Sequence, residues 1–146
     1  MKKGEMLSLA LKFATEKHFG QFDKGGNPYI LHPLKVMYYL KSDDEELQCI
    51  ALLHDVVEDC GVTYQELREL GLSERIIAGV KGMTKLPGET YEEAMIRIKS
   101  NPDSIRVKLC DLRHNSDIRR LKGVTEKDIK RIEKYQKMYQ TLKALV

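Results

Sequence analysis

The sequence has 146 residues, of which 42% are hydrophobic and 32% are charged, and 25 Lys and Arg against 22 Asp and Glu give a net charge of +3. These proportions exclude a disordered, charge-rich segment, and the length predicts a single domain over residues 1–146. The small basic excess allows an anionic ligand but is below that of a dedicated nucleic-acid binder.

The three cysteines are an odd number without paired short spacings: Cys49, Cys60 and Cys110. This argues against a disulfide framework and a cysteine-built zinc site, and it favours a reducing compartment. No apolar run approaches the roughly 20 residues that a membrane helix needs, and the charged N-terminus does not have the pattern of a signal peptide. We therefore expect a cytoplasmic protein without a membrane partner.

Helical periodicity recurs along the chain, and no alternating β-type run appears. The first expected helix covers residues 7–18, and the second begins at His32-Pro33, because proline fits the first turn of a helix. The pattern then predicts helices over residues 45–59, 63–70, 73–84, 90–98, 102–121 and 132–142. The expected fold class is all-α, a single-domain bundle of about seven or eight helices.

The predicted helix over residues 45–59 combines an apolar surface with ionisable groups. Residues 49–53 are apolar all round, yet His54, Asp55, Glu58 and Asp59 follow directly. Burying a carboxylate costs several kcal/mol unless it is paired, hydrogen-bonded or bound to a cation. Glu58 lies three residues after Asp55 and four after His54, so these groups project toward one region. A divalent metal ion is the simplest partner for them.

Two further candidate ligands, His32 and Asp111, each lie next to an apolar helical stripe. Two imidazoles and two carboxylates form a mixed nitrogen and oxygen set that suits Mn²⁺ best, with Fe²⁺, Co²⁺ or Zn²⁺ as alternatives. The pair Glu58 and Asp59 could then orient or deprotonate a water for attack on phosphorus. A buried salt-bridge network without a metal is the competing interpretation. His18 and His114 are interpreted as packed or supporting histidines rather than ligands.

Four segments of the sequence carry a family resemblance: residues 18–21, 26–33, 51–59 and 108–111. They contain, in this order, His-Phe-Gly-Gln, a His-Pro pair, His-Asp-x-x-Glu-Asp and Lys-Leu-x-Asp. The chain resembles the hydrolase domain of the bifunctional alarmone synthetase/hydrolases and, equally, the stand-alone small alarmone hydrolases. Both belong to the HD-domain phosphohydrolase superfamily. The similarity runs from about residue 7 to residue 139.

The resemblance implies an Mn²⁺-dependent enzyme whose metal ligands are His32, His54, Asp55 and Asp111. Glu58 and Asp59 match the acidic pair that activates the attacking water. The family removes pyrophosphate from the ribose 3′ position of guanosine tetra- or pentaphosphate (ppGpp or pppGpp), which leaves GDP or GTP. The expected function is therefore ppGpp hydrolysis.

The same resemblance implies five substrate contacts: Lys24, Lys85, Asn115, Arg131 and Tyr135. The expected partner is a small nucleotide, and neither a nucleic acid nor a membrane is expected. The sequence leaves open whether the protein is a monomer or a homodimer.

Two departures from the family pattern define the alternatives. Asp23 stands where the family usually has arginine, and the run over residues 111–115 moves a basic residue about 100° round its helix. A second hypothesis therefore keeps the chemistry but takes an adenosine alarmone or the 2′-phosphate of NADPH. A third is a non-enzymatic nucleic-acid or effector-binding module that uses Arg106, Lys108, Arg113, Arg119, Arg120 and Lys122.

Overall fold

The computed structural model describes residues 1–146. Its regular secondary structure is helical, apart from one isolated β-bridge between Phe22 and Pro28. Nine α-helices and one 3₁₀ helix follow in chain order: α1 (Glu5–His18), α2 (Leu31–Leu40), α3 (Glu45–Leu53), α4 (Val56–Cys60), α5 (Tyr64–Glu69), α6 (Glu74–Met83), α7 (Tyr91–Lys99), α8 (Pro102–Asn115), η1 (Ile118–Arg120) and α9 (Glu126–Lys143). The predicted all-α fold class is confirmed.

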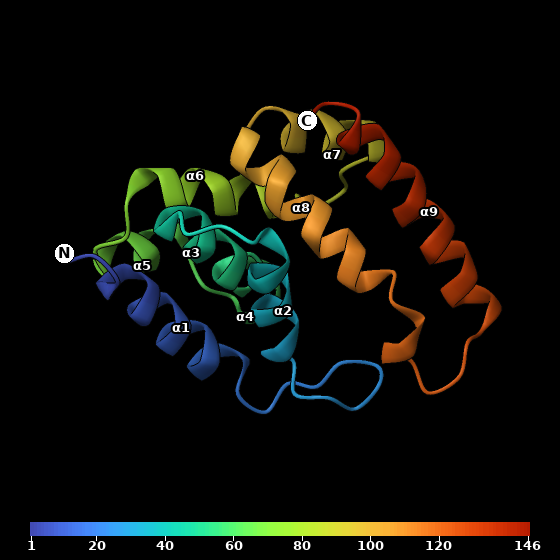
Figure 1. Cartoon of the computed structure of the whole chain (residues 1–146), viewed down its shortest axis with the longest axis horizontal. Coiled ribbons are helices and arrows are strands. Elements are labelled where there is room, and N and C mark those ends of the chain that lie inside the picture. The colour runs from blue at the N-terminus through green and yellow to red at the C-terminus, as the bar shows by residue number, and fades with distance from the viewer.

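Helix α3 lies at the centre of the main core. All its residues from Cys49 to Leu53 are fully buried, as is Leu47. Helices α1, α2, α6 and α8 pack around it, and Figure 1 shows the first three of these on the same side of the molecule. Each large side chain buried here contributes about 1.5–3 kcal/mol. Because α3 is buried up to its last residue, the segment that follows it starts in the protein interior.

A second, smaller core lies between the C-terminal helices α7, α8 and α9. Its buried members are Met95, Ile98, Ile105, Leu109, Leu112, Met138 and Leu142. Helix α8 also contributes Val107 to the main core. It therefore joins the two cores, and Figure 1 shows it running between the N-terminal helices and α9.

The predicted helix over residues 45–59 is wrong as a single element, because α3 ends at Leu53 and α4 begins at Val56. In a straight helix, successive side chains point about 100° apart. Here the side chains of His54 and Asp55 approach each other, with 3.1 Å between Nε2 and Oδ2. Nδ1 of His54 donates to the carbonyl oxygen of Ala51 at 2.6 Å, which holds the ring against the last turn of α3.

The predicted helix over residues 102–121 ends six residues early, at Asn115. Asp117 then caps the 3₁₀ helix by accepting a hydrogen bond from the Arg119 backbone N–H at 3.0 Å. Ile118 is consequently 55% exposed and does not continue the apolar face of α8. The turn brings Arg120 to the loop after α1, where its Nη2 lies 3.4 Å from Asp23 Oδ2.

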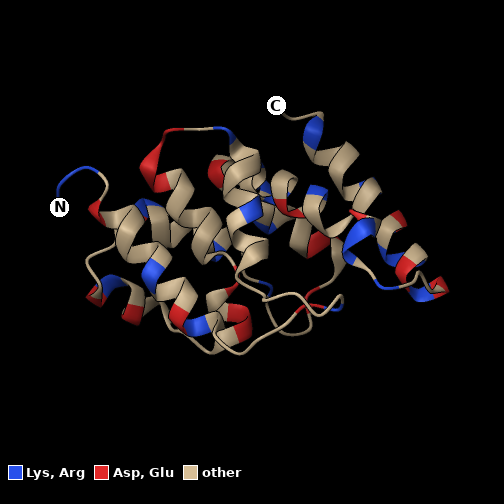
Figure 2. Cartoon of the chain, turned by 60° about the horizontal axis from the view of Figure 1, so that its bottom comes forward, with Lys and Arg blue, Asp and Glu red and all other residues tan.

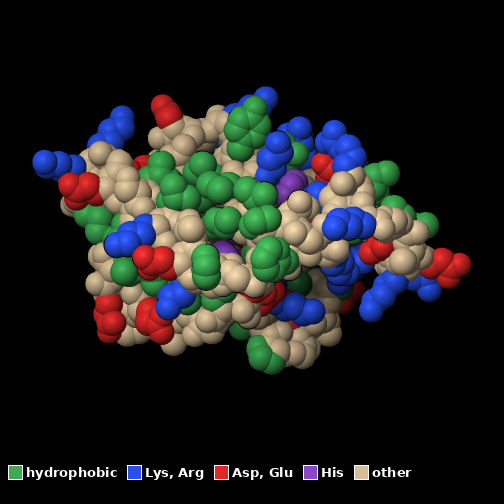
Figure 3. All heavy atoms as spheres, turned by 90° about the horizontal axis from the view of Figure 1, so that it is seen from below, with side chains coloured by type: hydrophobic (Ala, Val, Ile, Leu, Met, Phe, Trp, Pro, Cys, Tyr) green, Lys and Arg blue, Asp and Glu red, His purple; other side chains and the backbone are tan.

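Hydrophobic side chains also remain at the surface. Phe19, Tyr38 and Ile96 are each more than 60% exposed. Figure 3 shows hydrophobic side chains gathered at the centre of the face seen from below. No helix has the length and apolar character needed to cross a membrane. The oligomeric state, monomer or homodimer, stays a prediction.

Two glycines in α6 permit close packing of the helices that carry the site. A Cβ at Gly79 would lie 2.3 Å from Ile50 Cδ1 in α3, and a Cβ at Gly82 would lie 2.0 Å from Ser104 Oγ in α8. Both neighbours are fully buried. Since tightly packed interiors have no room for added methyl groups, these positions require glycine.

We expect Gly79→Ala to lower the free energy of unfolding by about 1–3 kcal/mol, because the clash with Ile50 outweighs the better helix propensity of alanine. The control is Ala78→Ser, which adds an atom at an exposed position of the same helix and should change stability by roughly 0.5 kcal/mol or less. Urea unfolding measures both. A Gly79→Ala variant as stable as wild type would contradict the close packing of α3 and α6.

Candidate metal centre and active site

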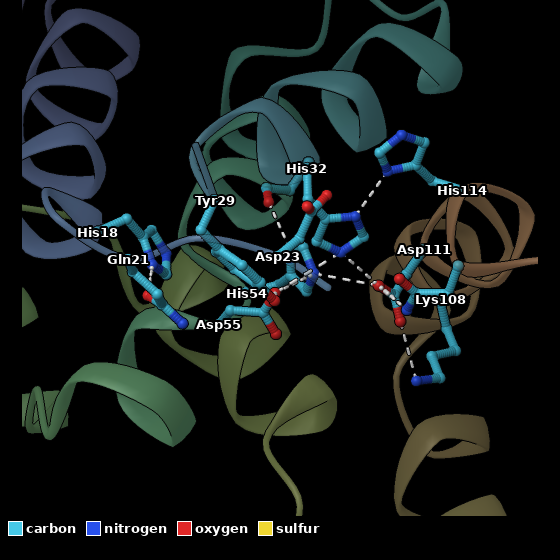
Figure 4. Close-up of polar contacts among 12 residues, drawn as sticks. His18, Gln21, Asp23, Tyr29, His32, His54, Asp55, Lys108, Asp111 and His114 are labelled. Atoms are coloured by element: carbon cyan, nitrogen blue, oxygen red, sulfur yellow. Dashed lines mark hydrogen bonds and ion pairs between the residues drawn. The ribbon is translucent and has the colours of Figure 1, made fainter. Parts of the chain in front are cut away.

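Three elements bring the predicted ligands together. The first turn of α2 supplies His32, the break between α3 and α4 supplies His54 and Asp55, and the middle of α8 supplies Asp111. Figure 4 shows the four side chains pointing toward one another from these elements. Both histidines are 2% exposed and Asp111 is 5% exposed. The cluster is therefore buried among helices that are distant in sequence.

The donor atoms of these four residues face a common point. Asp111 Oδ1 lies 2.9 Å from His32 Nε2 and 3.3 Å from His54 Nε2. Asp55 Oδ2 lies 3.1 Å from His54 Nε2 and 3.6 Å from His32 Nε2. The ligand atoms of His32, His54 and Asp55 are all within 4.8 Å of one another. His32, His54 and Asp55 thus form a group that could hold a metal ion, and Asp111 lies beside both histidines.

The arrangement fits a divalent metal ion. Two ligand atoms that bind one ion at about 2.1 Å and at right angles lie about 3 Å apart, which is close to the four distances given above. The Nε2 atom of His54 is buried and has no hydrogen-bond partner of acceptable geometry. A mixed set of imidazole nitrogen and carboxylate oxygen suits Mn²⁺, Fe²⁺, Co²⁺ and Zn²⁺.

The electrostatics of the cluster favour a positive charge at its centre. Burial alone would raise the pKa of Asp111, but Lys108 and the two imidazoles lower it well below its usual value. Burial alone would lower the pKa of His54, but Asp55 and Asp111 raise it. The ionised carboxylates therefore attract either a proton on His54 or a cation, and a metal ion would have to displace that proton.

Neighbouring side chains hold the two carboxylates in position. Lys108 Nζ donates to Asp111 Oδ2 at 3.0 Å, and Asn115 Nδ2 donates to Asp111 Oδ1 at 3.1 Å. The hydroxyl of Tyr29 donates to Asp55 Oδ2 at 2.7 Å. Charge-assisted hydrogen bonds of this kind fix the direction of a carboxylate.

Sequence reasoning missed Tyr29 and Lys108 as parts of the site, although a signal was present. Tyr29 precedes His32 by three residues, and Lys108 precedes Asp111 by three. Residues three apart lie on the same side of a helix or helical turn. The same spacing places His114 three residues after Asp111, and its ring is nearly parallel to that of His32, with an interplanar angle of 11°. His18 lies apart from the ligands and bonds to Gln21 Oε1 at 2.8 Å.

The predicted acidic pair lies beside the cluster on α4. Glu58 and Asp59 line the same cavity as His54, Asp55 and Asp111. Glu58 Oε1 accepts a hydrogen bond from the Lys85 backbone N–H at 2.8 Å. Burial and the charges of Asp55 and Glu58 raise the pKa of Asp59 to about 6. A carboxylate with a pKa near neutrality is suited to accept and release a proton.

Two adjoining cavities of about 280 Å³ and 330 Å³ open beside the cluster. Together they gather the five predicted substrate contacts. Lys85 lines the first cavity, Lys24 and Arg131 line the second, and Asn115 and Tyr135 line both. Cavities that bind small molecules are typically of about this size or larger. Lys24 is exposed, whereas Arg131 is held by an ion pair with Asp128.

Asp23, which departs from the family pattern, has a structural role in its loop. Its Oδ1 accepts hydrogen bonds from the backbone N–H groups of Gly25 at 3.0 Å and Asn27 at 2.9 Å. Its Oδ2 faces Arg120, whose Nη1 donates to Asn115 Oδ1 at 2.9 Å. The carboxylate therefore closes the loop and ties it to the end of α8 on the wall of the second cavity.

Comparison with known proteins identifies the family. The HD domain family matches residues 10–142 of the chain. This match covers most of the sequence and includes all four residues of the donor cluster. The chain belongs to the HD domain family.

The similar curated proteins are much longer. A guanosine-3′,5′-bis(diphosphate) 3′-pyrophosphohydrolase of Aquifex aeolicus is 38% identical over 117 residues, which are 73% of this chain and 17% of that protein. A protein of the same name from Haemophilus influenzae is 39% identical over 114 residues, covering 70% of this chain and 17% of its own length. A GTP pyrophosphokinase rsh of Brucella ovis is 34% identical over 136 residues, 84% of this chain and 18% of its own length. The chain spans less than a fifth of each relative.

A solved structure shares the fold. It is described as a metazoan ortholog of SpoT that hydrolyses ppGpp, and it matches 97% of this chain and 87% of its own with a TM-score of 0.80. The sequence identity is 22%. This likeness confirms that the helices are arranged as in a known helical fold.

We expect Asp59→Asn to stabilise the metal-free protein at pH 8 and to have little effect at pH 4. Because the pKa of Asp59 is raised to about 6 in the folded state, the native protein holds a proton that the unfolded chain releases above about pH 4. The free energy of unfolding therefore falls as pH rises from 4 to 6 and stays lower above that.

The asparagine variant does not ionise, so it should be more stable than wild type at pH 8 by about 1–2 kcal/mol, a value reduced for the solvent exposure of this carboxyl group. Urea unfolding in EDTA at both pH values measures the difference. A variant that is less stable than wild type at pH 8 would contradict the raised pKa.

Proposed function

We propose that this chain is a divalent-metal-dependent phosphohydrolase that removes the 3′-pyrophosphate from guanosine tetra- or pentaphosphate. The observation that carries the proposal is the convergence of two imidazoles and two carboxylates beside a polar cavity that is also lined by Glu58 and Asp59. The names of the relatives from Aquifex and Haemophilus support ppGpp as the substrate.

In this proposal the metal ligands are His32, His54, Asp55 and Asp111, and Mn²⁺ is the preferred ion. When bound, the ion would supply Lewis acidity that polarises a phosphoryl oxygen of the substrate. The ion suits the nitrogen and oxygen donors, and no cysteine lies in the set. Fe²⁺, Co²⁺ and Zn²⁺ are the alternatives.

The remaining catalytic roles fall to residues on the cavity wall. Asp59 takes the proton of the attacking water, because its carboxylate lies on the cavity wall beside the ligands. Glu58 orients that water, and its own position is fixed by the Lys85 backbone N–H. The side chains of Lys85 and Lys24 place positive charge where the phosphates of a nucleotide would lie. Substrate positioning falls to Asn115, Arg131 and Tyr135.

The nucleic-acid hypothesis is weakened by the contacts of its basic residues, because several of them are paired with acidic side chains. Lys108 is turned toward Asp111, Arg119 is paired with Asp117, and Arg120 is directed at Asp23. Figure 2 shows acidic and basic residues interspersed along the helices rather than a continuous basic face. A nucleic-acid surface requires unpaired cations gathered on one face.

The second candidate function is the same chemistry on an adenosine alarmone or on the 2′-phosphate of NADPH. It is favoured by one observation, the position of Asp23 on the wall of the second cavity. A carboxylate there cannot stack on a base as a guanidinium can. The choice of base therefore has to be tested with both classes of nucleotide.

We expect Mn²⁺ to raise the Tm of the wild-type protein. An ion that binds the folded state alone adds about 2.7 kcal/mol at a concentration of 100 times its Kd. Asp111→Asn should lose this shift, because the amide removes a charged ligand from the cluster. The control is Asp128→Asn, which changes a buried aspartate in α9 outside the cluster and should keep the shift. Equal shifts in Asp111→Asn and wild type would argue against the ligand set.

We expect the Mn²⁺-loaded protein to release pyrophosphate from ppGpp and leave GDP. Asp59→Asn and Glu58→Gln should lower kcat by about 10²-fold or more, while the Mn²⁺-induced rise in Tm persists. Glu69→Gln, an exposed change on α5, is the control. The assay includes an adenosine alarmone and NADPH. Turnover of the adenosine alarmone or NADPH without turnover of ppGpp would select the second candidate function. Wild-type rates in both Asp59→Asn and Glu58→Gln would show that these two residues have no catalytic role.

A further inference from the structure

The ring of His32 makes a polar contact through each of its two nitrogens. Nε2 faces the donor cluster, where it lies 2.9 Å from Asp111 Oδ1. Nδ1 points the other way and lies 2.8 Å from Nδ1 of His114. The two rings are nearly parallel, with an interplanar angle of 11° and 5.0 Å between their centroids, and Figure 4 shows the contact between them.

A hydrogen bond between two imidazole nitrogens contains one proton, so the pair has two arrangements. If His114 donates, His32 carries its own proton on Nε2 and points it at Asp111. If His32 donates from Nδ1, its Nε2 is free of a proton and His114 is the acceptor. The two arrangements differ in whether His32 Nε2 has an available lone pair.

Only the second arrangement allows His32 to bind a metal ion through Nε2, because a ligand nitrogen must offer its lone pair. His32 is 2% exposed, so water does not readily replace a missing acceptor at Nδ1. Without His114, the tautomer needed for metal binding would leave a buried N–H unpaired, and the other tautomer would still have Asp111 as its partner.

We propose that His114 is a positioning residue for the metal centre, which accepts the hydrogen bond of His32 Nδ1 and so fixes the tautomer that leaves Nε2 free. This inference rests on the metal centre of the proposed function but not on its nucleotide substrate.

The surroundings of His114 hold it in place for this role. Its ring lies edge-on to the Tyr39 ring, with 6.1 Å between the centroids. The Arg113 guanidinium packs over the same Tyr39 ring, 3.8 Å from its centroid. Its backbone carbonyl oxygen accepts a hydrogen bond from Arg120 Nη1 at 3.2 Å. The position of the acceptor nitrogen is therefore fixed by contacts outside the donor cluster.

Two substitutions distinguish the role of the acceptor nitrogen of His114 from the role of its aromatic ring. His114→Phe keeps an aromatic ring at this position but removes the acceptor. His114→Asn removes the ring but can place its Oδ1 close to the position of Nδ1. The measurement is the Kd for Mn²⁺ of the full chain by isothermal titration calorimetry, with no nucleotide present. We expect a loss of about 10–100-fold for His114→Phe and a loss of about threefold or less for His114→Asn.

A His114→Phe variant with wild-type affinity would overturn the inference, and so would equal losses in both variants, which would indicate packing alone. Circular dichroism of the metal-free variants establishes that each is folded. Nitrogen-15 NMR of the wild-type protein loaded with Zn²⁺ gives a readout that needs no variant. We expect a proton on His32 Nδ1 and none on His114 Nδ1, and the opposite assignment would overturn the inference. Since no nucleotide enters these measurements, a failure of ppGpp hydrolysis is a separate result.

Discussion

The structure depends on the need to neutralise two carboxylates that are buried next to two imidazoles. Asp55 lies in the break between α3 and α4 and Asp111 lies in α8, and each is within hydrogen-bonding or ion-pair distance of both His32 and His54. Burial makes such a group of charges costly unless a cation completes it. Lys108 neutralises one side of Asp111, and the other oxygen of Asp111 faces the two imidazoles at the centre of the cluster. A divalent ion is the partner whose charge and ligand preferences match this demand.

The all-α fold class, and the candidate ligands that the structure brings together, could be predicted from the sequence. The apolar residues recur with helical spacing, and no segment shows the alternation expected of a strand. The ionisable residues that begin at His54 directly follow an apolar run, which indicates that they are buried. The position of Pro33 correctly placed His32 near the start of a helix. The break after Leu53 could not be predicted in this way, because residues on both sides of it continue the helical pattern. It arises from tertiary contacts that turn His54 and Asp55 toward the same point.

The contacts that support the ligands were out of reach for similar reasons. The pair of His32 and His114 joins residues 82 apart in sequence, and the contact of Asp23 with Arg120 joins residues 97 apart. Spacing within one helix can place Lys108 beside Asp111, but it cannot tell which face a separate helix presents. The roles of the cavity residues in binding a nucleotide stay predictions, although the structure brings all five to the walls of two adjoining cavities.

The convergence of four side chains on one ion can be measured directly by anomalous X-ray diffraction from crystals grown with Mn²⁺. We expect one strong anomalous peak at the manganese edge, within about 2.0–2.4 Å of His32 Nε2, His54 Nε2 and one oxygen each of Asp55 and Asp111. No peak at this position in crystals that hold Mn²⁺ elsewhere, or a peak that lacks either histidine as a ligand, would contradict the metal centre.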